Sequence, residues 1–241
     1  MTIICLYTNP NDPSSLKKFK SSFICEKLKK NSKFKIIEVI GGNFTKTSFA
    51  NGKLRLAHDE SYSSLSVKTF KMIDYLVKNV NFTKIIKLDP NIIDYSKKDN
   101  IFMGADCLDF FYNSKRIESA IFNDDNRDYF GIHLINHISK KNYESWAFTK
   151  QLKNINFDTE FKGESCPPFY TGKLYGVSHD FSTFISSNGK HIAMNHKKNL
   201  GGSEDTMVGR LFAKYIKKIN WTYEQPWIGD LKESFKFVHN I

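Results

Sequence analysis

TIICLYTNPNDPSSLKKFKSSFICEKLKKNSKFKIIEVIGG, residues 2–42, is the stretch that decides the fold. Residues 2–8 are apolar and β-branched, which predicts a buried strand, and the Asn- and Pro-rich run 8–13 predicts a turn. A serine can then cap a helix that we expect over about 14–28, and a second buried strand is expected over 34–40. Strand, helix and strand in this order predict a right-handed parallel α/β unit.

The rest of the chain extends this α/β pattern. Apolar spacing predicts a helix over 62–80, and the segment 83–89 is typical of a strand that ends in an aspartate. One or two strands are expected over 99–112, and a late apolar stripe with a 3.6-residue period predicts a helix that has Ser203 as its N-cap. Because the sequence has no internal repeat, low-complexity tract or linker, we expect one domain over 1–241.

Composition and charge narrow the class of protein. With 40% hydrophobic and 15% aromatic residues, the 241-residue chain has ample apolar material for a core. Its formal net charge of +11 suggests nucleic-acid binding. However, the excess is almost all scattered lysine, whereas reading of base edges favours arginine. A basic, solvated surface suited to anionic substrates or membranes is therefore favoured over a nucleic-acid groove.

The sequence also predicts an intracellular setting. No apolar run approaches the roughly 18–20 residues that span a bilayer, and the first ten residues lack the basic start of a signal peptide. The four cysteines are widely spaced and form neither a metal-ligand pattern nor an evident disulfide framework. A reducing compartment is the simpler account of these features.

A candidate metal site follows the strand 83–89. A carboxylate at the end of a central strand, Asp89, with a second oxygen ligand at Asn91, can hold Mg²⁺ or Mn²⁺ against a diphosphate. Such a cation would neutralise the charge that builds on a nucleoside diphosphate leaving group. The alternative is an ordinary turn, since Asp-Pro-Asn is also typical of turns.

A candidate general base lies at the start of the late helix, in the segment GGSED (201–205). A helix N-terminus that a Gly-Gly loop presents to a cleft can fix a carboxylate and keep it ionised, as a general base requires. Acidic residues are also common in a first turn simply because they complement the helix dipole. Both interpretations stay open for Glu204 and Asp205.

Two further segments attract attention. SCPPFYTGKLYGVSHD (165–180) combines paired prolines, an aromatic, a glycine loop and a short apolar strand, which is typical of a rigid lip on a binding cleft. His239 ends an apolar segment, where a lone histidine usually serves packing or a hydrogen bond. HExxH, G-x-S-x-G, P-loop and G-x-G-x-x-G motifs are absent from the sequence.

Taken in order, these motifs resemble the inverting β-1,3-galactosyltransferase and N-acetylglucosaminyltransferase family, which includes the fringe-type enzymes. DESYSSLSVKT (59–69) is similar to the family's D-x-Y-x-N-L-T-x-K-T, and KIIKLDPNII (84–93) stands where the family has a strand and K-x-D-D-D-x-F. CPPFYTGKLYGVSHD (166–180) is similar to Y-P-P-Y-x-x-G-x-G-Y-x-x-S-x-D, and GSEDTMVG (202–209) to E-D-V-x-x-G. FVH (237–239) resembles a terminal strand that carries a metal-binding histidine.

The resemblance covers roughly residues 55 to 241 and includes departures. The acidic triplet has become Asp89-Pro90-Asn91, so the third position is an amide, which supplies one less negative charge. Lys173 and Leu174 stand where small residues are usual. The membrane anchor of the Golgi members is missing, which is expected for a bacterial protein, for a viral protein in the host cytoplasm, or for a shortened chain.

The resemblance implies a GT-A glycosyltransferase fold, which is a Rossmann-like mixed sheet flanked by helices with a smaller acceptor-binding region. The nucleotide-binding half would cover about 1–112 and the acceptor-binding half about 113–241. The implied reaction is the transfer of a hexose or N-acetylhexosamine from a nucleotide sugar, most simply a UDP-sugar, to a hydroxyl of a glycan acceptor, with inversion. A non-catalytic carbohydrate-binding relative and a basic nucleic-acid-binding protein are the alternatives.

The resemblance also assigns roles to individual residues. Asp205 would take the proton from the acceptor hydroxyl, and Mn²⁺ or Mg²⁺ would be held by Asp89, Asn91 and His239. The nucleotide pocket would be shaped by five residues: Thr8, Asn9, Asp59, Lys68 and Lys87. Substrate contacts would come from Gly172 and Glu204, and Trp146 or Phe169 would stack on a sugar face.

Overall fold

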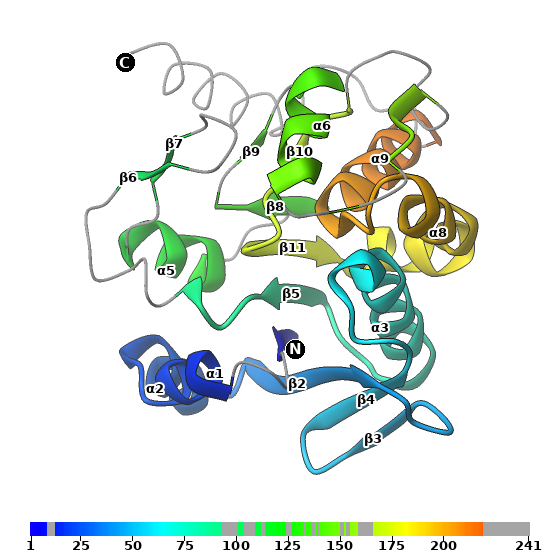
Figure 1. Cartoon of the computed structure of the whole chain (residues 1–241). Coiled ribbons are helices and arrows are strands. Elements are labelled where there is room, and N and C mark those ends of the chain that lie inside the picture. Colours follow the sequence, from blue (N-terminus) through cyan, green and yellow to red (C-terminus); the bar gives the residue numbers. More distant parts are fainter. Residues whose placement is uncertain are drawn as a thin grey trace.

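The structure is a computed structural model of the whole chain with an α/β fold (Figure 1). Its central element is a seven-stranded mixed sheet with the order β3-β4-β2-β1-β5-β11-β8. The residues that the structure describes are 1–8, 13–92, 101–103, 109–111, 114–123, 127–132, 134–135, 138, 140–149, 152, 155–158 and 166–218.

The first half of the sheet is parallel, as the sequence predicts. β1 (Thr2–Tyr7) lies between β2 (Phe34–Gly42) and β5 (Lys84–Leu88), and both pair with it in parallel. β4 (Lys53–Ala57) pairs in parallel with the outer side of β2. The carboxyl ends of these four strands therefore meet at one edge of the sheet, where ligands of open α/β sheets bind.

Helices cover both faces of the sheet, and β1 shows how the sequence determines this. Ile3 and Cys5 pack into a core cluster with helices α3 (Leu65–Asn79), α8 (His179–Asn199) and α9 (Glu204–Lys218). Their neighbours Ile4 and Leu6 pack into a second cluster with α1 (Pro13–Lys20), α2 (Phe23–Lys30) and α5 (Ser114–Phe122). Side chains alternate across a strand, so an unbroken apolar run fills two cores.

The single helix predicted over about 14–28 is wrong in one respect, because the structure has two helices there. α1 ends at Lys20, and the hydroxyl of Ser22 accepts a hydrogen bond from the Cys25 backbone N–H at 3.2 Å, which caps α2. The Ser22 hydroxyl also donates to the Phe19 carbonyl at 2.7 Å. Serine side chains compete with the helical ladder in this way, so paired serines divide the segment.

A β-hairpin that the sequence interpretation missed forms the outer edge of the sheet. β3 (Ser48–Ala50) runs antiparallel to β4, and Asn51 and Gly52 between them have positive φ angles of 50° and 71°. A two-residue turn with both central residues in this region matches the twist of the flanking strands, and Asn-Gly is the dipeptide that adopts it most readily.

The second half of the chain completes the sheet with antiparallel strands. β11 (Leu174–Ser178) pairs with β5, and β8 (Tyr129–Gly131) pairs with β11. The sheet thus contains strands from both predicted halves of the chain, and the division near residue 112 stays a prediction. The helix predicted over 62–80 is present as the short 3-10 turn η1 (Tyr62–Ser64) followed by α3.

Two small sheets and one further helix lie outside the main sheet. β6 (Ile101–Met103) pairs with β7 (Asp109–Phe111), which confirms the one or two strands expected over 99–112. β9 (Leu134–Ile135) pairs with β10 (Phe169–Tyr170), near α6 (Lys140–Thr149) (Figure 1). In the part of the chain that the structure describes, every helix is too short or too polar to cross a bilayer.

Candidate active site at the carboxyl end of β5

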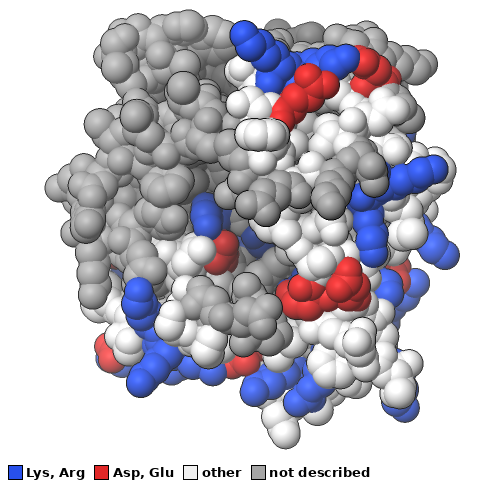
Figure 2. All heavy atoms as spheres, in the orientation of Figure 1, with Lys and Arg blue, Asp and Glu red and all other residues white. Residues whose placement is uncertain are grey.

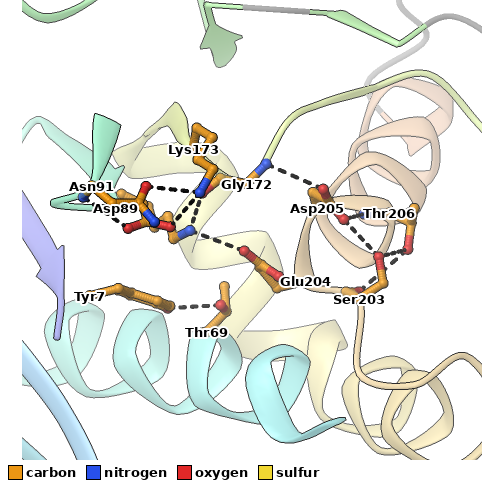
Figure 3. Close-up of polar contacts among 11 residues, drawn as sticks. Tyr7, Thr69, Asp89, Asn91, Gly172, Lys173, Ser203, Glu204, Asp205 and Thr206 are labelled. Carbon is orange, nitrogen blue, oxygen red and sulfur yellow. Dashed lines mark hydrogen bonds and ion pairs between the residues drawn. The ribbon is translucent and has the colours of Figure 1, made fainter. Parts of the chain in front are cut away.

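The pairing of β5 with β11 brings together three segments that are far apart in the sequence. Leu88, at the end of β5, pairs with Leu174, at the start of β11, and the Asp89 backbone N–H donates to the Lys173 carbonyl at 2.9 Å. The residues after β5 therefore lie against those before β11. The first turn of α9 approaches the same place, as Figure 3 shows.

The first part of the site is a lysine held by the two predicted metal ligands. The Lys173 ammonium lies 3.1 Å from Asp89 Oδ2 and 2.8 Å from Asn91 Oδ1 (Figure 3). The Asn91 backbone N–H donates to Asp89 Oδ1 at 3.2 Å, which fixes the carboxylate as in an Asx turn. The side chains of Lys173 and Asp89 are 28% and 30% exposed, so this ion pair borders solvent.

As arranged, the described residues do not fit the predicted divalent cation. Both oxygens that would bind it already contact an ammonium, and that positive charge repels a second cation. Among the residues described by the structure, His, Cys, Asp and Glu side chains do not gather in any group of three or more that could hold a metal ion. His239, the third predicted ligand, lies outside the described residues.

The second part of the site is a buried ion pair between β5 and α9. Lys87 Nζ lies 3.0 Å from Glu204 Oε1, and the two side chains are only 4% and 9% exposed. The Lys87 ammonium also donates to the Gly172 carbonyl and lies over the Tyr7 ring, 4.8 Å from its centroid. Lys87, which the sequence predicts to bind the nucleotide, and Glu204, which it predicts to contact the substrate, are thus both held by contacts within the protein.

The third part is Asp205, in the first turn of α9. Its Oδ2 accepts a hydrogen bond from the Gly172 backbone N–H at 3.2 Å, and its Oδ1 accepts from the Ser203 hydroxyl at 2.7 Å and the Thr206 N–H at 2.8 Å. The predicted N-cap is therefore modified. Ser203 precedes the helix as expected, but its hydroxyl donates to Asp205, whose own carboxylate accepts from the helical N–H.

The surroundings of Asp205 tune its proton affinity. Burial and then the neighbouring charge of Glu204 raise the pKa of Asp205 to about 6, although its hydrogen bonds with Ser203 and Thr206 act in the opposite direction. The carboxylate is therefore mostly ionised at neutral pH and still basic enough to take up a proton. This is the protonation behaviour expected of a general base.

Two glycines allow these segments to approach so closely. A Cβ atom on Gly172 would lie 2.4 Å from Glu204 Oε1, so a larger residue would push the carboxylate aside. Gly202 has a φ of +77°, and a Cβ atom there would lie 2.0 Å from the Ser63 carbonyl oxygen. The predicted substrate residue Gly172 is thus required, in the first place, by the packing of the site itself.

Of the predicted nucleotide residues, Thr8 follows β1, Lys68 reaches it from α3, and Asp59 lies before η1. Lys68 is buried, forms an ion pair with Glu60 and donates to the Thr8 carbonyl at 3.4 Å. Burial lowers the pKa of Lys68. Glu60, which the sequence interpretation missed, also accepts from the Gly41 N–H at the end of β2.

Asp59, the predicted nucleotide residue beside Glu60, is used differently. Its Oδ2 accepts hydrogen bonds from the Ser61 hydroxyl at 2.6 Å and the Ser64 hydroxyl at 3.0 Å, and the first of these is the main reason why the pKa of Asp59 is lowered. Asp59 thereby organises the turn before α3, whereas Glu60 reaches the strand ends. In the pattern D-x-Y-x-N-L-T-x-K-T the acidic residue stands two positions before the tyrosine, and Glu60, not Asp59, stands two positions before Tyr62. This spacing was the signal that could have identified Glu60.

The predicted aromatic contacts are corrected in part. Phe169 is 3% exposed and packs in an apolar cluster with Tyr143, Phe157 and Leu200, so its ring belongs to the core and not to a sugar-stacking surface. Trp146 lies in α6, and its side chain is outside the described residues, as is the whole of Asn9.

Comparison of the sequence with protein-family models and with curated proteins finds no match. The site combines three groups: the Lys173 ammonium, which borders solvent, the buried Lys87–Glu204 ion pair, and the Asp205 carboxyl, whose pKa is raised. Lys173 is itself one of these groups, and its neighbour Gly172 contacts the other two through its carbonyl and its N–H (Figure 3).

Proposed function

We propose that this chain is an inverting, nucleotide-sugar-dependent glycosyltransferase whose α/β fold is of the GT-A type. One observation carries the proposal: three of the motif segments behind the family resemblance converge on Gly172. Its N–H donates to Asp205 at 3.2 Å, and its carbonyl accepts from Lys87, which is paired with Glu204 at 3.0 Å. Segments so distant in the sequence have no local reason to meet.

In the proposed reaction Asp205 is the general base. Its carboxylate accepts the proton of an acceptor hydroxyl while that oxygen forms a bond to the anomeric carbon of the donor sugar. The bond from the anomeric carbon to the diphosphate oxygen breaks, and the nucleoside diphosphate leaves with the bonding electron pair. Attack and departure on opposite faces invert the anomeric centre. The pKa of about 6 for Asp205 supports this role at neutral pH.

The donor is proposed to lie along the carboxyl ends of β1, β2 and β5, with its nucleotide near Thr8 and Lys68 and its diphosphate near residues 89–91. A UDP-sugar and a glycan hydroxyl follow from the family resemblance. We place the reaction in a reducing compartment such as the cytoplasm, which is supported by the free and buried thiols of Cys5, Cys25 and Cys166.

The test is a turnover assay with a panel of nucleotide sugars, measuring nucleoside diphosphate release and sugar transfer to simple glycans. We expect Asp205→Asn to lower turnover by about 100-fold or more, which is within the usual range for loss of a general base. Asp180→Asn is the matched control, because Asp180 also lies in the first turn of a helix but has an 83% exposed side chain. Unchanged turnover in Asp205→Asn would remove Asp205 from the mechanism.

A non-catalytic carbohydrate-binding relative is the second candidate, and the lysine held by Asp89 and Asn91 favours it over a metal-dependent enzyme. The same assay separates the two, since this candidate binds sugar but releases no nucleoside diphosphate. Nucleic-acid binding is less favoured, because lysines and arginines are spread over the described surface seen in Figure 2 instead of gathering in one patch.

A further inference from the structure

We propose that Lys173 supplies the positive charge that binds the donor diphosphate, so that donor binding in this protein needs no divalent cation. The inference rests on the proposed function. Both predicted metal ligands contact the Lys173 ammonium instead of a metal ion: Asp89 at 3.1 Å and Asn91 at 2.8 Å.

The position of the lysine is fixed by the sheet. The Lys173 carbonyl accepts from the Asp89 N–H at 2.9 Å, and the next residue, Leu174, pairs with Leu88. The backbone of Lys173 is therefore anchored beside the carboxylate that its side chain contacts. With its side chain 28% exposed, the ammonium is held in place and still borders solvent, where a diphosphate can reach it.

Charge balance links the two departures from the family pattern. A carboxylate at position 91 would give the pair Asp89 and residue 91 a charge of about −2, which suits a divalent cation. With Asn91 the pair carries one negative charge, and one lysine neutralises it. The amide at position 91 and the lysine at position 173 thus complement each other, because the Lys173 ammonium occupies the place that a metal ion would take.

The arrangement also places the cation next to the base. Gly172, whose N–H donates to Asp205 at 3.2 Å, directly precedes Lys173 in the chain, so the segment that carries the cation also contacts the proposed base on α9. An ammonium can bind phosphate oxygens as a point charge with several N–H donors, which is how lysine binds phosphate in other proteins.

The experiment measures binding and not only turnover. Inorganic pyrophosphate, UDP, GDP, ADP and CDP are titrated into the full-length protein by calorimetry, in EDTA and in Mn²⁺. For the ligand that binds most tightly, we expect dissociation constants that agree within about twofold in the two buffers. Lys173→Ala should weaken binding in EDTA by about 10-fold or more, as expected for the loss of a charge-assisted hydrogen bond, and Lys173→Arg should keep most of it.

Lys78→Ala is the matched control, because Lys78 also pairs with an aspartate, Asp74, at 2.8 Å, but lies at the end of α3 that leads to the opposite edge of the sheet. Its affinity should equal that of the wild type. Binding that Mn²⁺ tightens by tenfold or more, no binding of any of these ligands in EDTA, or wild-type affinity in Lys173→Ala would each overturn the inference. A thermal melt of each variant shows that it is folded.

The two proposals fail separately. If diphosphates bind in EDTA through Lys173 but no nucleotide sugar is turned over, the glycosyltransferase is refuted and the role of Lys173 stands. If sugar transfer occurs but stops in EDTA, the enzyme stands and the role of Lys173 is refuted.

Discussion

Two regions of the same sheet edge handle charge in opposite ways. At the end of β5, Lys173 bridges Asp89 and Asn91 at a place that borders solvent. At the start of α9, Glu204 is held by the buried Lys87, while neutral N–H and O–H groups hold Asp205. In the first region an ammonium and its two oxygen partners border solvent, whereas in the second region burial raises the pKa of the Asp205 carboxyl to about 6. Charged groups that lie close together thus differ in their chemical properties because they differ in burial and in the groups that they contact.

The largest expected effect is on folding stability, in the buried region. Lys87→Met leaves the Glu204 carboxylate buried without its partner, which should lower the free energy of unfolding by about 3–5 kcal/mol. Urea denaturation measures this. In the double variant Lys87→Met, Glu204→Leu most of the loss should be recovered, because no uncompensated charge remains. A single variant as stable as the wild type would show that the pair is not the buried element described above.

The second effect is the pH dependence of turnover. The pKa of about 6 means that Asp205 is ionised above this pH and protonated below it. A protonated carboxyl cannot accept the acceptor's proton, so the rate should fall by about tenfold for each pH unit below about 6. Rates measured between pH 4 and pH 8 test this, with melting curves to exclude acid unfolding. A rate that stays flat down to pH 4 would contradict the role of Asp205.

The third effect concerns the contact between the two regions. Gly172→Ala places a Cβ atom 2.4 Å from Glu204 Oε1, and such overpacking should cost about 1–3 kcal/mol of unfolding free energy. The cost should shrink in a Glu204→Ala background, where the clashing oxygen is absent. Equal costs in the two backgrounds would show that the close approach of Gly172 and Glu204 is not what requires glycine.

The smallest effect is expected in the exposed region. Lys173→Met removes an ion pair that borders solvent, and such pairs contribute about 0–1 kcal/mol to stability. Its unfolding free energy should therefore lie within about 1 kcal/mol of the wild type, in contrast to Lys87→Met. A loss as large as that of Lys87→Met would remove the distinction between the two regions.

The sequence predicted the parallel strands well because their signal is local. The apolar, β-branched runs 2–8, 34–40 and 83–89 predicted strands of a parallel sheet, and they are β1, β2 and β5. Asn51-Gly52 was an equally local signal that was overlooked. The long helix α8 was also missed, since its polar sequence has only a weak apolar stripe, although Ser178 caps it by accepting from the Phe181 N–H.

The site was predictable only in part, because its decisive contacts are not local. The motif around Asp205 pointed to the right helix start, and the departure at Lys173 was visible in the sequence. That the Lys173 ammonium would lie on Asp89 depends on the antiparallel pairing of β11 with β5, which no local pattern encodes.

The pairing of β11 with β5 also has a consequence for how the protein folds. The contact between Lys173 and Asp89 joins residues 84 positions apart, and that between Lys87 and Glu204 spans 117 positions. Closing such long loops is slow, because their entropy is lost before the contacts form. The parallel strands can assemble from nearby segments, whereas the site requires β11 and α9 to dock. The site should therefore form late in folding. A chain that ends before β11 and α9 should form the parallel strands but not the site.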